Sequence, residues 1–178
     1  MFVLITGGCK NGKSRLAEKI LTAYDVPNMP RFYVATMEPF GSEAAEAIAR
    51  HRKIRDGKNF NTIEKYTDIS EIELPQDSGV LLECICNLCA NEMFSANEKS
   101  PVPKIIRGIE TLINYTEIFV AVTNQVGSDG VKYSHETMEY IQQMGLLNNR
   151  LAELADVVIE AVFGIPVLLK GDLPKCLC

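Results

Sequence analysis

The chain has 178 residues, of which 47% are hydrophobic and 23% charged, and this composition predicts one soluble domain spanning residues 1–178. Its formal net charge of −5 excludes a general nucleic-acid binder, which would present a broad basic surface. No apolar run reaches the roughly 18 residues of a membrane span, and the first residues lack the features of a signal peptide, so we expect a cytoplasmic protein without a membrane span.

Short apolar runs alternate along the chain with stretches of helical spacing. The runs are expected to be strands and cover residues 2–5, 32–35, 80–85, 118–123, 157–162 and 166–169. Helical spacing of apolar residues occurs over residues 16–24, 44–51, 105–113 and 138–154. The first four runs are apolar at nearly every residue, which is typical of parallel strands covered on both faces by helices. The last two runs predict a hairpin, and residues 91–103 predict a surface connection.

The first turn carries a phosphate-binding pattern. Gly7 is followed after four residues by Gly12, Lys13 and Ser14, with a predicted strand before them and a predicted helix after them. Glycines in such a turn let backbone N–H groups point at phosphate oxygens, and the helix N-terminus adds partial positive charge. Lys13 would reach the outer phosphates, and the Ser14 hydroxyl would ligate Mg²⁺. The pattern predicts a nucleoside triphosphate site, with GTP and ATP both open.

Polar residues stand near the carboxyl ends of the predicted parallel strands, where ligands bind in open sheets of this kind. Thr36 ends the second run, Glu83 lies late in the third, and Thr123 ends the fourth. A carboxylate in a buried apolar strand is costly unless it has a partner, and Mg²⁺ held through water would supply one. An ion pair with a lysine or arginine is the alternative for Glu83.

A histidine stands among cations in "ARHRKIRDGK", residues 49–58. His51 lies on the apolar stripe of the predicted helix, while Arg52, Lys53 and Arg55 surround it with positive charge. That charge would keep the imidazole neutral, and a neutral imidazole nitrogen can attack phosphorus. The alternative is a structural histidine in a helix whose charges complement its dipole.

The cysteines are predicted to be reduced thiols. Cys84, Cys86 and Cys89 fall within six residues of one another, and Cys176 and Cys178 lie near the C-terminal end. The spacing of the first three differs from that of paired zinc ligands, and a zinc site built from them is the alternative.

Six segments follow one another in the order found in a known enzyme family. They are "LITGGCKNGKSRLAE", "YVATMEPFGSEAAEAIARHR", "VLLECI", "VAVTNQVG", "GLLNNRLAELADVV" and "GIPVLLK". Through them the chain resembles, nearly end to end, the bifunctional adenosylcobinamide kinase and adenosylcobinamide-phosphate guanylyltransferase family of cobalamin biosynthesis. The resemblance implies an α/β P-loop fold with a RecA-like, mostly parallel sheet flanked by helices, often assembled as a trimer.

The resemblance also implies two reactions: phosphorylation of the aminopropanol hydroxyl of adenosylcobinamide, and transfer of GMP from GTP to that phosphate. His51 stands where the family guanylylates a histidine as a covalent intermediate, and Lys13 with Mg²⁺ would offset charge on the departing pyrophosphate. Mg²⁺ would be held by Ser14 and Glu83. The nucleotide site implied by the resemblance and the phosphate pattern comprises Gly7, Gly8, Cys9, Lys10, Asn11, Gly12, Lys13, Ser14, Thr36, Arg52, Lys53, Arg55, Glu64 and Glu83.

The chain departs from the family pattern at several positions, among them Ile141 and Gln142, where the family usually has Arg-Asp, and one acidic position after the fourth predicted strand. The family usually has Asn-Glu-Val-Gly where this sequence has Asn124, Gln125, Val126 and Gly127, so an amide replaces a carboxylate that could bind metal or the acceptor hydroxyl. We therefore expect GMP transfer to occur and phosphorylation of adenosylcobinamide to be weak or absent. Two alternatives stay open: a small-molecule kinase without a covalent intermediate, and a nucleotide-binding protein with reduced catalysis.

Overall fold

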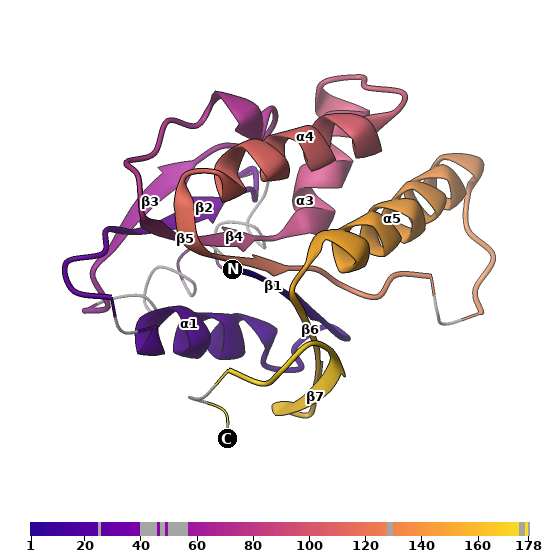
Figure 1. The fold of residues 1–178 in the computed structure, drawn as a ribbon. Coiled ribbons are helices and arrows are strands. Elements are labelled where there is room, and N and C mark those ends of the chain that lie inside the picture. The colour runs from indigo at the N-terminus through magenta and orange to yellow at the C-terminus, as the bar shows by residue number, and fades with distance from the viewer. Residues whose placement is uncertain are drawn as a thin grey trace.

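A seven-stranded sheet with helices on both faces forms the described part of the protein (Figure 1). The structure is a computed structural model, and it describes residues 1–24, 26–39, 46, 49, 57–127, 130–174 and 177. The strands are β1 (Phe2–Thr6), β2 (Arg31–Ala35), β3 (Phe60–Glu64), β4 (Ser78–Glu83), β5 (Thr116–Val122), β6 (Val157–Val162) and β7 (Ile165–Lys170). The helical elements are α1 (Lys13–Ala23), the 3₁₀ turn η1 (Ile69–Glu71), α3 (Ile85–Ala90), the π-helical turn η2 (Asn91–Ser95), α4 (Pro101–Ile113) and α5 (His135–Leu154).

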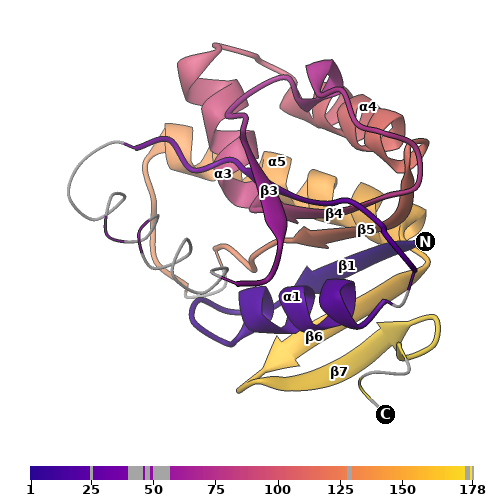
Figure 2. The same cartoon turned by 90° about the vertical axis from the view of Figure 1, so that its left-hand side faces the viewer.

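The strands follow the order β3-β2-β4-β5-β1-β6-β7 across the sheet. All neighbours pair in parallel except β6 and β7, which form an antiparallel hairpin. Figure 2 shows β1, β6 and β7 lying side by side toward one edge of the sheet. The carboxyl ends of β1 to β6 therefore lie in one row at the same end of the strands. The predictions of a mostly parallel α/β sheet and of a C-terminal hairpin are both confirmed.

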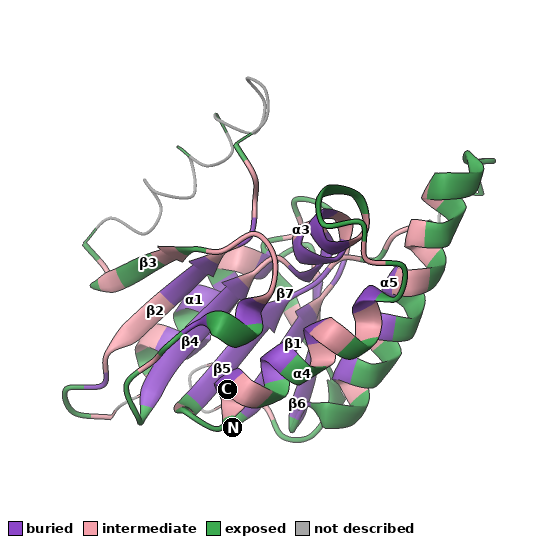
Figure 3. Cartoon of the chain, turned by 90° about the horizontal axis from the view of Figure 1, so that it is seen from above, coloured by how far each residue is buried: buried purple, intermediate pink, exposed green. Residues whose placement is uncertain are grey.

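Apolar side chains cover the two faces of the sheet. Helix α1 packs on one face, and α3, α4 and α5 pack on the other (Figure 1). Burial is greatest in the central strands, while the outer surface of α5 is exposed (Figure 3). Residues from Phe2 to Ile5 and from Ile118 to Val122 are buried on both faces, which explains why those runs are apolar at every position.

Two elements near β3 differ from the sequence prediction. Strand β3 was not predicted, because it lies at the edge of the sheet and its residues are exposed or half-buried, so no apolar run marks it. Residues 91–103 were predicted to be a surface connection, which is wrong. They contain η2 and the start of α4, and both Asn91 and Glu92 are buried. Buried polar residues held by hydrogen bonds leave no hydrophobic pattern in a sequence.

The helix predicted over residues 44–51 lies outside the described residues, apart from Glu46 and Ala49, which are helical. None of the helices in the described ranges combines the length and the apolar composition that a membrane crossing requires.

Candidate functional site

The phosphate loop connects β1 to α1 and is pressed against β6 and its hairpin. Gly7 has φ 135° and Gly12 has φ 85°. A Cβ atom at Gly7 would lie 2.6 Å from the Ala161 carbonyl oxygen, and one at Gly12 would lie 3.3 Å from Gly164 Cα. Gly164 N–H also donates to the Asn11 carbonyl at 3.1 Å. Both loop glycines are therefore required by backbone conformation and by the close approach of the hairpin.

The residues between the two glycines differ in exposure. Gly8 and Asn11 are half-buried, whereas Cys9 and Lys10 are exposed. Lys10 has φ 60°, a left-handed backbone conformation, and the side chains of Cys9 and Lys10 face solvent. A loop of this shape presents backbone groups to an anion.

Lys13, the first residue of α1, folds back over the loop. Its Nζ donates to the carbonyl of Gly7 at 2.9 Å and to that of Gly8 at 2.6 Å, and the residue is only 7% exposed. Burial lowers the pKa of Lys13, and nearby acidic groups, among them Cys9 and Glu83, oppose that shift. The lysine is therefore held by carbonyl oxygens that a phosphate could replace.

Ser14 and Glu83 are brought into contact. The Ser14 hydroxyl donates to Oε1 of Glu83, and the Tyr33 hydroxyl donates to Oε2 at 2.9 Å. Glu83 is the last residue of β4 and is half-buried. The hydroxyl and carboxylate oxygens are hard donors of the kind that Mg²⁺ prefers, so these two residues fit a magnesium site.

Thr36 follows β2 and ties its tip to that of β4. Its hydroxyl donates to the Cys84 carbonyl and accepts from the Cys84 N–H, both at 2.8 Å, and its own N–H donates to the Glu83 carbonyl at 3.1 Å. The side chain is fully buried. A contact between Thr36 and nucleotide stays a prediction from the resemblance.

A pocket of about 370 Å³ lies at the tips of β2 and β3. Its walls are Glu38, Glu64, Lys65, Tyr66, Thr67, Ser95 and Ala96. Glu64 was predicted to bind nucleotide, and it lines this pocket. Strands β2, β4 and β5 separate β3 from β1 in the sheet, so Glu64 lies apart from the phosphate loop.

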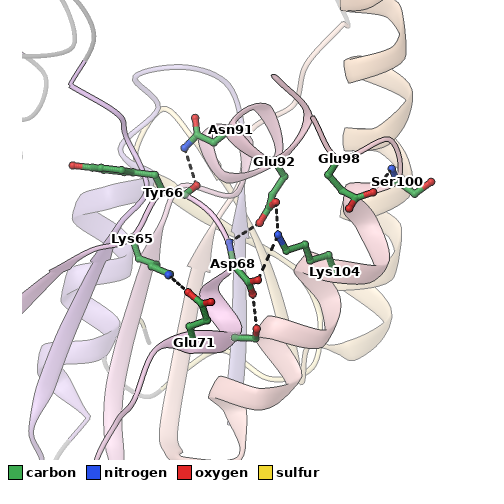
Figure 4. Close-up of polar contacts among 10 residues, drawn as sticks. Lys65, Tyr66, Asp68, Glu71, Asn91, Glu92, Glu98, Ser100 and Lys104 are labelled. Carbon is green, nitrogen blue, oxygen red and sulfur yellow. Dashed lines mark hydrogen bonds and ion pairs between the residues drawn. The ribbon is translucent and has the colours of Figure 1, made fainter. Parts of the chain in front are cut away.

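Asn91 in η2 links the segments that carry this pocket, and Figure 4 shows its contact with Tyr66. Its Nδ2 donates to the carbonyl of Thr36 at 2.8 Å and to that of Tyr66 at 2.9 Å. The two acceptors belong to the segments that follow β2 and β3. A single buried amide therefore holds both walls, and sequence reasoning missed it because its partners are distant backbone atoms.

Glu92, the next residue, holds the chain beyond Tyr66. It is 1% exposed and accepts from Asp68 N–H at 2.6 Å and from Lys104 Nζ at 2.9 Å (Figure 4). Lys104 Nζ also lies 3.5 Å from the Asp68 carboxylate. The hydrogen bond from Lys104 to Glu92 raises the pKa of the lysine. The buried carboxylate is thus paired, as burial of a charge requires.

The thiols near the tip of β4 form a polar cluster between the phosphate loop and this pocket. Cys86 Sγ accepts from Asn124 N–H at 3.3 Å and lies 3.9 Å from the Thr123 hydroxyl. A hydrogen bond from Cys84, with these contacts, lowers the pKa of Cys86 to about 6, and the same interaction and burial raise the pKa of Cys84. Cys9, Cys84, Cys86 and Cys89 are free thiols. Within the described ranges, no three His, Cys, Asp or Glu residues gather as metal ligands.

The predicted nucleophile and the cations beside it have no described position. His51, Arg52, Lys53 and Arg55 lie outside the described residues. His135, the other histidine, lies in the first turn of α5 with an 87% exposed side chain. Ser134 caps that helix by accepting from Thr137 N–H, so His135 is a surface residue.

Comparisons with known proteins agree with the resemblance. The profile of the family described as "Cobinamide kinase / cobinamide phosphate guanyltransferase" matches residues 3–169. The chain is 30% identical over 187 residues to the "Bifunctional adenosylcobalamin biosynthesis protein CobU" of Escherichia coli (strain K12), covering 96% of this chain and 100% of the relative. It is 31% identical over 186 residues to the protein of the same name from Salmonella typhimurium (strain LT2), with the same two shares.

A solved structure shows the same fold. The flagellar accessory protein FlaH from Methanocaldococcus jannaschii aligns with a TM-score of 0.51 at 14% identity, covering 96% of this chain and 78% of that one. With a phosphate loop between β1 and α1, the parallel sheet has the RecA-like P-loop architecture that the resemblance implied.

Proposed function

The chain belongs to the cobinamide kinase / cobinamide phosphate guanyltransferase family, and from this membership we propose that it transfers GMP from GTP to adenosylcobinamide phosphate through a guanylylated His51. The relatives are named as bifunctional proteins of adenosylcobalamin biosynthesis. The acceptor and the covalent intermediate are the parts of the proposal that require a direct test.

The phosphate loop is the observation that carries this proposal. Lys13 Nζ lies over the loop within hydrogen-bond distance of two carbonyls, and Ser14 touches Glu83 beside it. Triphosphate oxygens in the loop would replace the carbonyls as acceptors for Lys13. Ser14 and Glu83 would hold Mg²⁺, which would supply positive charge to the phosphates.

The transfer is proposed to take place in two displacements. A neutral nitrogen of His51 attacks the α-phosphorus of GTP, and the N–P bond forms as the bond to pyrophosphate breaks. Lys13 offsets the charge that develops on the departing pyrophosphate. A phosphate oxygen of the acceptor then attacks the same phosphorus and releases His51. Because of the intermediate, the anionic acceptor phosphate does not have to attack the anionic triphosphate directly.

Intact-protein mass spectrometry after incubation with GTP and Mg²⁺ tests the covalent step. We expect a gain of one GMP that is acid-labile, absent in His51→Ala and retained in His135→Ala. His135 is the matched control because it is the other histidine and is exposed on α5. If GTP binds and no adduct forms, the covalent route is wrong, and the small-molecule kinase and the nucleotide-binding protein become the better hypotheses.

We also propose a homo-oligomer, which the resemblance implies to be a trimer. Strand β7 and the turn before it support this, because they expose the apolar residues Phe163, Ile165, Val167, Leu168 and Leu169. Exposed apolar patches of this kind mark association surfaces. Analytical ultracentrifugation checks the proposal, and a monomer at all accessible concentrations would contradict it.

A further inference from the structure

A second carboxylate stands beside the phosphate loop, on the side away from Glu83. Gln125 lies shortly after β5, and its Nε2 donates to Oε1 of Glu160 on β6 at 2.9 Å. Strand β1 lies between β5 and β6 in the sheet. The hydrogen bond therefore bridges the two strands that flank β1, at the end where the phosphate loop begins.

Contacts along β6 place Glu160 next to the loop. Glu160 is opposite Thr6 in the parallel register of β6 and β1. The next residue, Ala161, has its carbonyl oxygen so close to Gly7 that a Cβ atom there would approach to 2.6 Å. Glu160 thus stands at the level of the last residue of β1, one step before the first glycine of the loop.

Glu160 and Glu83 flank the loop in different surroundings. Glu83 contacts the hydroxyls of Ser14 and Tyr33 and has the position expected of a metal ligand. Glu160 is half-buried and accepts from a neutral amide. It lies on the same face of β6 as Val158, which packs in the core layer of α3, α4 and α5, opposite the α1 face. Two carboxylates in different surroundings can have different chemical roles in one site, such as metal ligand and general base.

We propose that Glu160 is the general base for phosphoryl transfer to the hydroxyl of cobinamide, and that Gln125 orients its carboxylate. The inference rests on the proposed function for its acceptor. The hydroxyl oxygen attacks the γ-phosphorus of the bound nucleoside triphosphate, and an O–P bond forms as the bond from that phosphorus to the β–γ bridging oxygen breaks. The hydroxyl proton passes to Glu160, and the nucleoside diphosphate leaves with the bridging oxygen.

This assignment replaces the expectation that phosphorylation is weak or absent. That expectation followed chiefly from Gln125, because an amide cannot take the hydroxyl proton. In the fold the Gln125 amide donates a hydrogen bond to the carboxylate of Glu160 on β6. GMP transfer needs no such base, since neither a neutral imidazole nitrogen nor a phosphate oxygen has a proton to lose when it attacks.

The Glu160→Gln variant tests the assignment, because it keeps the shape of the side chain and removes the proton acceptor. We expect kcat for phosphorylation of adenosylcobinamide to fall about 100-fold with little change in nucleotide KM. GMP adduct formation should stay within about twofold of the parent. Glu117→Gln is the matched control, because this exposed glutamate lies near the amino end of β5, at the other end of the strands from the phosphate loop. Both activities should be unchanged in this variant.

Gln125→Ala provides a second test that leaves the carboxylate in place. We expect a smaller loss in phosphorylation kcat, roughly tenfold, because Glu160 would lose the donor that orients it. Thermal unfolding of each variant checks that the fold persists. Phosphorylation by Glu160→Gln within about twofold of the parent would overturn the assignment. So would a parent that forms the GMP adduct and never phosphorylates cobinamide. A parent that phosphorylates cobinamide without a GMP adduct would overturn the covalent route alone and leave Glu160 testable as stated.

Discussion

The carboxyl ends of the parallel strands form a row that carries two sites, the phosphate loop after β1 and the pocket after β2 and β3, and the two sites are built in different ways. At the β1 end, the phosphate loop is encoded in consecutive residues from Gly7 to Ser14. At the β3 end, the pocket walls come from segments spread between Thr36 and Ala96 and are linked by the buried Asn91. The β1 end holds the charged groups that act on phosphate. At the β3 end, hydrogen bonds hold backbone segments at a fixed separation. The comparison predicts that substitutions at the β1 end lower the reaction rate and that substitutions at the β3 end raise the KM for nucleotide.

Lys13→Ala should have the largest effect, because it removes the cation that offsets phosphate charge. We expect the rate of GMP adduct formation to fall about 100-fold or more. Quenched-flow sampling with intact-mass detection measures this rate, and circular dichroism checks that α1 persists. An adduct rate within about tenfold of the parent would mean that the loop acts without its lysine.

Glu83→Gln and Glu64→Gln apply the same change to opposite ends. For Glu83→Gln we expect the Mg²⁺ concentration at half-maximal rate to rise roughly tenfold, because a charged oxygen donor is lost. For Glu64→Gln we expect a higher KM for nucleotide and an unchanged Mg²⁺ requirement. Magnesium titrations at saturating nucleotide separate the two. An equal rise in the Mg²⁺ requirement of both variants would contradict the assignment of Mg²⁺ binding to the β1 end.

Asn91→Ala should act through the pocket walls. The change leaves the buried carbonyl of Thr36 and the half-buried carbonyl of Tyr66 without their donor, and we expect a loss of about 1–3 kcal/mol in the free energy of unfolding. Nucleotide KM should rise more than kcat falls. Asn87→Ala on α3 is the control, a half-buried residue of the same type one turn earlier. Urea unfolding and steady-state kinetics measure both effects, and equal behaviour of the two variants would contradict a clamp at Asn91.

Cys86 lies between the two ends and should have the smallest effect, seen in the pH dependence of stability. Its pKa is lowered from 9.0 to about 6 in the folded protein. Between these values the folded state has lost a proton that the unfolded state still binds, so the free energy of unfolding should rise with pH. We expect a rise of at most about 2 kcal/mol from pH 6 to pH 8, absent in Cys86→Ser. Thermal melts at several pH values test this, and parallel profiles for the two proteins would count against it.

The same contrast explains how much could be predicted. Buried parallel strands and the phosphate loop leave local signals, because every residue from Phe2 to Ile5 is apolar and each loop glycine has a fixed spacing. The placement of Glu83 at the same end of the sheet as the phosphate loop followed from the rule that the carboxyl ends of parallel strands converge. Asn91 and Glu160 could not be found this way. Each acts through a partner more than twenty residues distant, and no local pattern encodes such a pairing.

The order of these elements along the chain has a consequence for synthesis. The phosphate loop leaves the ribosome before β5 and β6 do, yet its strand pairs with both of them, and its turn is backed by Gly164. Translation proceeds at about 5–20 residues per second, so the loop waits roughly 8–30 seconds for those partners. A nascent chain stalled before β6 should therefore fail to retain a nucleotide, and that ability should appear only once the hairpin has emerged.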